Sequence, residues 1–246
     1  MLSKILDFFW PRECAVCKGA SDRPGRYICS GCLMRLPFLP VDGLCRCCGR
    51  DAPAVDGEFL CTGCSSPPRP SFDRVGSVLR FDGYLRELVN AYKFRGALYL
   101  RNDFVDFLEA FVRVRFPVEK IAFILPMPSA FANRFWRGYN QCDYLASALA
   151  KRLSVPYAGR ALKRCGVFRK QSELTADERR VNVKGTFAVA AEGRRFIAAM
   201  PPGSSVLVLD DIMTTGSTLS ECAKTLKKSS VENVWGVTLA RSQMNS

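Results

Sequence analysis

The stretch VLVLDDIMTTGST, residues 206–218, decides how the rest of this chain is interpreted. Its apolar start leads directly into two acids, and the acids lead into a loop of hydroxyl side chains around one glycine. A wholly apolar run predicts a strand buried on both faces, as in a parallel sheet covered by helices. We therefore expect a strand at residues 206–209, Asp210 and Asp211 at its carboxyl end, and a loop at 213–218 that opens a helix.

The loop has the features of a phosphate site. A helix that starts directly after it offers unpaired backbone N–H groups and the positive end of the helix dipole, and both favour phosphate. Thr214, Thr215, Ser217 and Thr218 add hydroxyl donors, and Gly216 lets a ligand approach the backbone. The two preceding carboxylates can accept hydrogen bonds from a diol. Together they predict a 5-phosphoribosyl ligand. An ATP-type P-loop does not fit, because Gly-Lys-Ser/Thr is missing.

The segments around this stretch alternate between strand and helix patterns. Such alternation predicts an α/β domain with a doubly wound, mainly parallel sheet. Ligands of these sheets bind outside the carboxyl ends of the strands. Both LPMPS and LDDIMTTGST lie at that edge. Further strands are expected at residues 72–81, 121–125, 157–165 and 234–241, and helices at 84–96, 98–114, 140–153 and 217–229.

Cysteines in C-x2-C pairs dominate the first part of the chain. Nine of the 12 cysteines fall between Cys14 and Cys64. The pairs form two sets, C-x2-C-x11-C-x2-C and C-x2-C-x12-C-x2-C, and each set suits a tetrahedral four-thiolate zinc site. Cys47 is left over, and crossed pairing between the halves stays open. The predicted metal ligands are Cys14, Cys17, Cys29 and Cys32 in the first half, and Cys45, Cys48, Cys61 and Cys64 in the second.

A structural role suits these sites better than a catalytic one, because four thiolates leave no position for water. Buried free cysteines and a redox C-x-x-C function are the alternatives. SSPPRPSFDR, residues 65–74, marks a linker. We place the domain boundary near residue 70. Residues 1–70 are expected to form a double zinc ribbon with a short N-terminal helix that folds on its metal, and residues 71–246 the α/β domain.

Composition limits the chemistry and the partners. The chain of 246 residues carries a net charge of +13 and no histidine. Its basic excess favours anionic partners. Without histidine, catalysis would rest on carboxylates, cations, backbone amides or a metal that arrives with substrate. The first residues lack a signal peptide pattern, and no apolar run is long enough for a transmembrane helix, so we expect a cytoplasmic protein with reduced thiols.

Four motifs in order resemble a known family. VLVLDDIMTTGST resembles the phosphoribosyl-pyrophosphate (PRPP) signature of type I phosphoribosyltransferases. YKFRG at 92–96, PMPSAFANRFWRGYNQCDYLA at 126–146 and QSELTADERRVNVKGTF at 171–187 precede it, behind the cysteine-rich part. The whole arrangement resembles the ComF family of competence-associated, phosphoribosyltransferase-like proteins, over nearly the entire chain. RGYNQ replaces the more usual RGFNQ, a mild aromatic exchange.

This resemblance implies PRPP binding and a role in DNA uptake during natural transformation. Asp210 and Asp211 would bind the ribose hydroxyls and carry the catalytic role, while PMPSA would hold pyrophosphate through the amides of Ser129 and Ala130. Mg²⁺ would arrive with PRPP, since it prefers oxygen ligands. The implied PRPP-binding set is Asp210, Asp211, Met213, Thr214, Thr215, Gly216, Ser217, Thr218, Pro128, Ser129, Ala130, Arg134 and Arg137.

Two basic segments extend the possible binding surface. Residues 163–184 resemble the mobile loop that closes over PRPP in transferases; a plain basic loop is the alternative. Trp136 and Tyr139 interleave with cations, a pattern typical of single-stranded nucleic-acid contacts, although core packing is the alternative for each aromatic. The candidate nucleic-acid contacts are Arg134, Arg137, Lys163, Arg164, Arg169, Lys170, Arg179 and Arg180.

Two functions follow from these patterns. The chain is either an enzyme that transfers phosphoribosyl from PRPP to an unknown acceptor and releases pyrophosphate, or a non-catalytic, PRPP-responsive module that binds single-stranded DNA or a protein. A competence helicase or another DNA-uptake protein, bound through the zinc ribbons, is the candidate protein partner. No segment indicates the acceptor or the oligomeric state.

Overall fold

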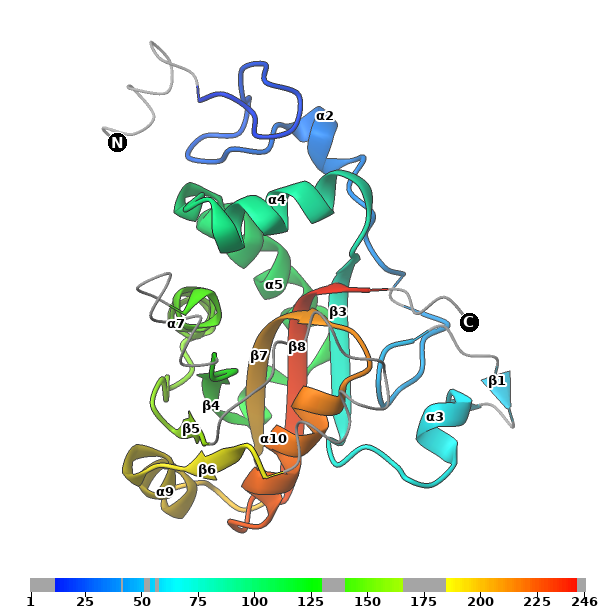
Figure 1. Ribbon diagram of the computed structural model, residues 1–246, viewed down its shortest axis with the longest axis vertical. Coiled ribbons are helices and arrows are strands. Elements are labelled where there is room, and N and C mark those ends of the chain that lie inside the picture. Colours follow the sequence, from blue (N-terminus) through cyan, green and yellow to red (C-terminus); the bar gives the residue numbers. More distant parts are fainter. Residues whose placement is uncertain are drawn as a thin grey trace.

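The centre of the computed structural model is a four-stranded sheet with the order β3-β8-β7-β4, and all three pairings are parallel (Figure 1). The structure describes residues 12–40, 42–50, 54–55, 58–129, 140–165 and 185–242. The sheet confirms the expected α/β class. Its strands are β3 (Arg74–Arg80), β4 (Ile121–Pro126), β7 (Ser205–Met213) and β8 (Asn233–Arg241).

Helices cover both faces of the sheet. Successive side chains of a strand point to opposite faces, and β7 shows the consequence. Leu207 and Leu209 join the core under the helices of one face, whereas Val206 and Val208 join the core on the other. All four are fully buried, which explains the unbroken apolar run before Asp210. The first face carries α4 (Gly83–Phe94), α5 (Arg101–Arg115) and α7 (Gln141–Leu153); the second carries α10 (Ser217–Lys227).

The strand β7 is longer than predicted. We expected it to end before the acids, but it continues through them to Met213. The reason is its neighbour β8, which pairs with β7 as far as Met213↔Arg241, whereas β4 leaves at Pro126↔Leu209. Asp210 and Asp211 therefore lie on a strand segment that has lost its neighbour on one side. The loop starts at Thr214, one residue later than predicted.

The predicted strand at 157–165 is only partly correct. Tyr157 forms a single parallel bridge with Ile124, and the strand itself is β5 (Leu162–Arg164). It pairs antiparallel with β6 (Phe187–Val189) and stays outside the main sheet. Neither β6 nor α9 (Ala191–Ala198) was expected from the sequence. The predicted helix at 98–114 begins as a 3-10 turn, η1 (Leu98–Leu100), and a second such turn, η2 (Val118–Lys120), precedes β4.

The two cysteine-rich segments lie at different places on the α/β domain (Figure 1). The first, with α2 (Ser30–Leu33), lies beyond α4. The second lies beside β3 and contains β1 (Ala54–Val55), β2 (Glu58–Phe59) and α3 (Thr62–Ser65). The boundary near residue 70 stays a prediction, and the predicted N-terminal helix falls outside the described residues. In the described part of the chain, no helix is both long and apolar enough to cross a membrane.

Candidate functional site

Asp210 and Asp211 form the centre of the candidate site, at the carboxyl end of β7. Each carboxylate accepts a hydrogen bond from the next backbone N–H: Asp211 N to Asp210 Oδ1 at 2.9 Å, and Ile212 N to Asp211 Oδ1 at 2.6 Å. Burial raises the pKa of Asp210 to about 7, and the neighbouring charge of Asp211 adds to that rise. Two adjacent, partly desolvated carboxylates are thus held in fixed positions.

Lys93 belongs to this site, although the sequence analysis did not assign it. Its Nζ lies 2.8 Å from Asp211 Oδ2, and the two side chains are only 15% and 17% exposed. It stands on the last turn of α4, within the YKFRG motif. Gln141, from the RGYNQ motif, donates from Nε2 to the Lys93 carbonyl oxygen at 2.7 Å. The structure therefore joins three motifs that lie far apart in the sequence.

Cys142 completes the acidic cluster. Its Sγ donates to Asp210 Oδ1 at 3.6 Å, and burial raises the pKa of this thiol. One ligand atom from each of Cys142, Asp210 and Asp211 lies within 4.8 Å of the others. The two carboxylates fit the preference of Mg²⁺ for oxygen, whereas a neutral thiol does not. The site therefore fits Mg²⁺ through its acids alone.

The loop after β7 leads into α10 through a left-handed glycine. Gly216 is the N-cap of α10 with φ +81°, where a side chain would be strained. A Cβ there would also lie 2.6 Å from Met213 Cε and 3.4 Å from Phe72 Cε1. Thr215 Oγ1 and Ser217 Oγ lie 2.7 Å apart. The glycine N-cap supplies no side chain to the first turn of α10, and the N–H of Ser217 instead donates to Thr215 Oγ1 at 3.3 Å. A phosphate site at this helix start stays a prediction.

The predicted pyrophosphate loop begins beside the acids. Met127 N donates to the Leu209 carbonyl oxygen at 2.7 Å, so the segment after β4 starts next to Asp210. The buried Ser129 Oγ has no hydrogen-bond partner among the described residues. Pro128 and Ser129 follow β4 at the carboxyl edge of the sheet, and their pyrophosphate role stays a prediction. The three other predicted contacts of this region, Ala130, Arg134 and Arg137, lie outside the described residues.

Both cysteine sets gather as predicted, each within its own half. The four sulfur atoms of each set lie within 4.8 Å of one another. The S–S distances of 3.8 Å for Cys17–Cys29 and 3.6 Å for Cys48–Cys61 match the edge of about 3.8 Å expected around a metal with Zn–S bonds near 2.3 Å. Both clusters therefore fit zinc, and pairing within halves replaces the open alternative of crossed pairing. Cys47 belongs to neither set.

Comparison with known proteins matches both parts of the chain. Residues 5–66 match the double zinc ribbon domain family, and residues 140–244 match the phosphoribosyl transferase domain family. The chain is 29% identical to competence protein F of Haemophilus influenzae, over 94% of this chain and 99% of that protein. The chain belongs to the ComF family.

Further relatives of this ComF-family chain are competence protein ComFC of Bacillus subtilis, 26% identical over 89% of this chain and 86% of that one, and DNA utilization protein YhgH of Escherichia coli O157:H7, 26% identical over 82% and 92%. An adenine phosphoribosyltransferase structure from Saccharomyces cerevisiae aligns with a TM-score of 0.38 at 18% identity, over 61% of this chain and 72% of that one.

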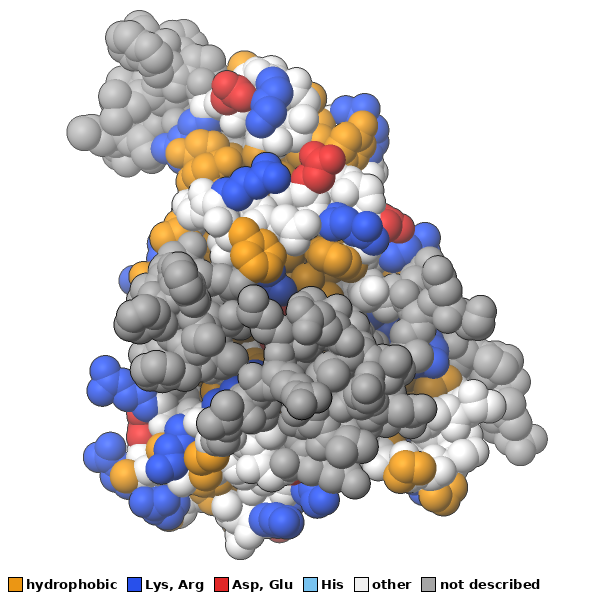
Figure 2. Space-filling view, viewed as in Figure 1, with side chains coloured by type: hydrophobic (Ala, Val, Ile, Leu, Met, Phe, Trp, Pro, Cys, Tyr) orange, Lys and Arg blue, Asp and Glu red, His pale blue; other side chains and the backbone are white. Residues whose placement is uncertain are grey.

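The predicted nucleic-acid residues of this ComF chain are only partly described. Lys163 is exposed on β5, whereas Arg164 is partly buried, with its guanidinium 5.7 Å from the centre of the Phe187 ring. Burial lowers the pKa of Arg164, and the charge of Asp210 opposes this. Figure 2 shows Lys and Arg spread over one face with fewer acids among them. The remaining members of the set, Arg134, Arg137, Arg169, Lys170, Arg179 and Arg180, lie outside the described residues, so this set stays a prediction.

A cation-lined cavity lies between the second cysteine cluster and the predicted phosphate loop, residues 214–216. Its volume is about 350 Å³. Thr215 of the loop and Ser217 at the start of α10 line it, and so do four cations. One of these, Arg241, is 8% exposed and donates from Nη1 to the Cys48 carbonyl oxygen. The predicted phosphate loop of this ComF chain therefore borders both the acids and a basic cavity. The lining cations are Arg50, Arg69, Lys224 and Arg241.

Proposed function

We propose that this ComF-family protein binds PRPP at the carboxyl edge of its sheet and acts in DNA uptake during natural transformation. One observation carries the proposal: two carboxylates stand directly before a glycine-capped helix start on the same strand–loop–helix unit. A diol and a phosphate on one ligand match that order of groups. The names of the relatives, competence proteins and DNA utilization proteins, support the process.

Each part of PRPP has a partner in this proposal. The ribose hydroxyls donate to Asp210 and Asp211, and the 5-phosphate accepts from the N–H groups of residues 215–218. Ser217 N would exchange its acceptor, Thr215 Oγ1, for the phosphate. The pyrophosphate lies against residues 128–130, where the buried Ser129 hydroxyl gains the partner that the described residues do not supply. Mg²⁺ would neutralise charge on the pyrophosphate when bound, and Asp210 and Asp211 are the described groups that fit it.

As an enzyme, the protein would exchange one bond for another at C1 of the ribose. The bond from C1 to the pyrophosphate oxygen breaks, pyrophosphate leaves with the electron pair, and a nucleophilic atom of the acceptor bonds to C1. The side chains described here hold the ribose in place and provide negative charge near the developing positive charge. Catalysis by positioning and electrostatics suits a chain without histidine.

Calorimetric titration with PRPP and Mg²⁺ tests the binding proposal. We expect the wild type to bind PRPP and the double variant Asp210→Asn, Asp211→Asn to show no measurable binding while its zinc content stays unchanged. Glu232→Gln is the matched control, because Glu232 is exposed and precedes β8 at the opposite edge of the sheet. Equal PRPP affinity in the double variant and the control would refute the site.

A second function, a non-catalytic module, is favoured by the cation-lined cavity beside the phosphate loop. Here PRPP would bind without being consumed, and a single strand of DNA would be the anionic partner. Pyrophosphate release, assayed over nucleobases, amines and oligonucleotides, separates the two functions. Release with any acceptor supports the enzyme. PRPP binding without release, combined with DNA binding at ~50 mM salt, supports the module, because phosphate contacts are strong at low salt.

A further inference from the structure

We infer that Lys93 is the positioning residue that holds the acid pair in the free protein and keeps a divalent cation from binding there alone. The inference rests on the proposed PRPP function, in which the metal enters together with a pyrophosphate-bearing ligand. Lys93 would then exchange its partner, from Asp211 to the anionic ligand. The YKFRG motif, which contains Lys93, has no other assigned role.

The position of Lys93 is fixed from two sides. Its carbonyl oxygen accepts the 2.7 Å hydrogen bond from Gln141, whose side chain belongs to a residue only 3% exposed. The helix α4 ends shortly afterwards, before Gly96 with φ +67°. The turn that carries Lys93 is therefore tied to the start of α7, and its ammonium reaches the acids from a fixed base. Only the flexible stem of the side chain is free to redirect the charge.

Charge explains why the acid cluster needs this cation. Two carboxylates and a buried thiol lie within 4.8 Å of one another. Adjacent like charges in a partly desolvated site raise each other's free energy, and a lysine at 2.8 Å offsets one of them. With Lys93 in place, the two carboxylates and the ammonium together carry a net charge of −1 rather than −2. A metal ion that arrives alone must break this ion pair and leave the ammonium without a partner.

A ligand with a pyrophosphate changes that balance. PRPP with one Mg²⁺ is still an anion, so the ammonium released from Asp211 finds phosphate oxygens nearby. Lysine suits this exchange because its charge sits on a long stem with three donors that can turn to a new acceptor. Metal binding and ligand binding thus become coupled through a single side chain, and the acid pair is protected from free divalent cations.

A titration with Mn²⁺ in the absence of PRPP tests the inference about Lys93. Binding is measured as the loss of the electron spin resonance signal of free Mn²⁺. The variants are Lys93→Met, which removes the charge at similar length, and Lys93→Arg, which keeps it. We expect Lys93→Met to bind Mn²⁺ about tenfold or more tightly than wild type, the scale of a partly buried charge pair, and Lys93→Arg to resemble wild type. Adding Asp211→Asn to Lys93→Met should abolish the new site.

One result would overturn the inference: a Lys93→Met variant that binds Mn²⁺ no more tightly than wild type does. A melting temperature that Mn²⁺ raises only in Lys93→Met supports the inference even if this variant is less stable. PRPP titration then separates the two proposals. If wild type binds no PRPP, the proposed function fails while the Mn²⁺ result still decides the role of Lys93.

Discussion

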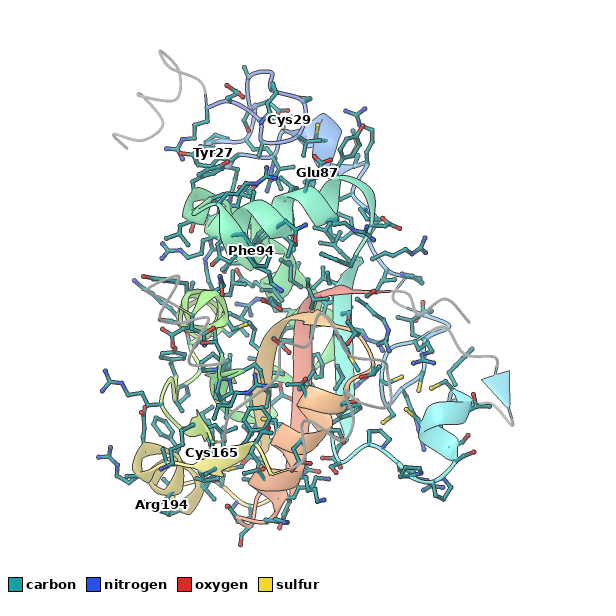
Figure 3. All side chains as sticks on the ribbon, in the orientation of Figure 1. Tyr27, Cys29, Glu87, Phe94, Cys165 and Arg194 are labelled. Atoms are coloured by element: carbon teal, nitrogen blue, oxygen red, sulfur yellow. The ribbon has the colours of Figure 1, made fainter. Side chains whose placement is uncertain are left out.

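The two four-cysteine clusters have nearly the same spacing, yet each is attached to a different part of the molecule. The first is held on α5 by ion pairs: Arg23 Nη1 lies 2.9 Å from Asp103 Oδ1, and Arg26 Nη2 donates to Asp106 Oδ1 at 2.9 Å. The backbone N–H of Tyr27 donates to the second oxygen of the fully buried Asp103. Figure 3 shows Tyr27 and Cys29 beyond α4, away from the strands.

The second cluster is attached to β3 and to the carboxyl ends of β7 and β8 instead. Val75 N donates to the Cys47 carbonyl oxygen at 2.6 Å, and Gly49, with φ +67°, lies so close to β3 that a Cβ would be 3.0 Å from the Val75 oxygen. Arg241 connects the Cys48 carbonyl oxygen with Met213 Sδ, which lies 3.6 Å from its Nη1. The same ligand pattern therefore anchors one ribbon to the outside of the domain and places the other against the candidate site.

The largest difference between the clusters is expected when each loses its metal. Cys29 and Cys61 are equivalent, because each is the N-cap of a short helix and a ligand of its cluster. Cys29→Ser and Cys61→Ser should each remove one metal ion and lower stability, since metal binding contributes directly to folding. Only Cys61→Ser should increase hydrogen exchange in residues 205–227, by about tenfold or more, and abolish PRPP binding.

Mass spectrometry gives the zinc content of each variant, and peptide mapping gives its hydrogen exchange. Both are measured on the same samples. The exchange readout needs no PRPP, so it tests the attachment of the second cluster even if the proposed ligand is wrong. Equal loosening of residues 205–227 in the two variants would show that the clusters do not differ in their influence on the site.

A smaller effect is expected from the two arginines that attach the ribbons. Arg23→Met leaves the buried Asp103 carboxylate without its guanidinium, so we expect a loss of about 3 kcal/mol in the free energy of unfolding and unchanged PRPP affinity. Arg241→Met removes a charged donor from the Cys48 carbonyl, at about 1.5–3 kcal/mol, and should also weaken PRPP binding about tenfold. Chemical denaturation and calorimetry provide the two values. If Arg23→Met weakened PRPP binding as much, the comparison would fail.

Much of the site could be predicted because its signals are local. The apolar run, the two acids and the glycine lie within one short stretch, and both cysteine sets together lie between Cys14 and Cys64. The structure therefore confirmed the strand, the helix start and both clusters. The longer β7 could not be predicted, because its last residues are held by pairing with β8 rather than by their own pattern.

Lys93 and Arg241 were missed for a different reason. A single lysine near the end of an amphipathic helix is usually a solvated cation, and its contact with Asp211 exists only because α4 and α7 dock above the strand ends. The attachment of the second ribbon likewise depends on Arg241, which is 193 residues away from Cys48 in the chain. Contacts of that range leave no periodic pattern that a sequence can display.

The smallest predicted effect contrasts two acids, one in the site and one under the first ribbon. The folded-state pKa of Asp210, about 7, lies above its ordinary value of 3.8, so its contribution to stability is present below the ordinary value and is lost as pH rises toward 7. Asp210→Asn should therefore raise the free energy of unfolding by about 1–3 kcal/mol at pH 8, and by less at pH 5.

Asp106, which Arg23, Arg26 and Arg152 contact, has the opposite role, and Asp106→Asn should lower stability at both pH values by about 1–2 kcal/mol. Denaturation curves at the two pH values decide the sign. A loss of stability in Asp210→Asn at pH 8 would mean that its carboxylate supports the fold, as Asp106 does, rather than being reserved for a ligand.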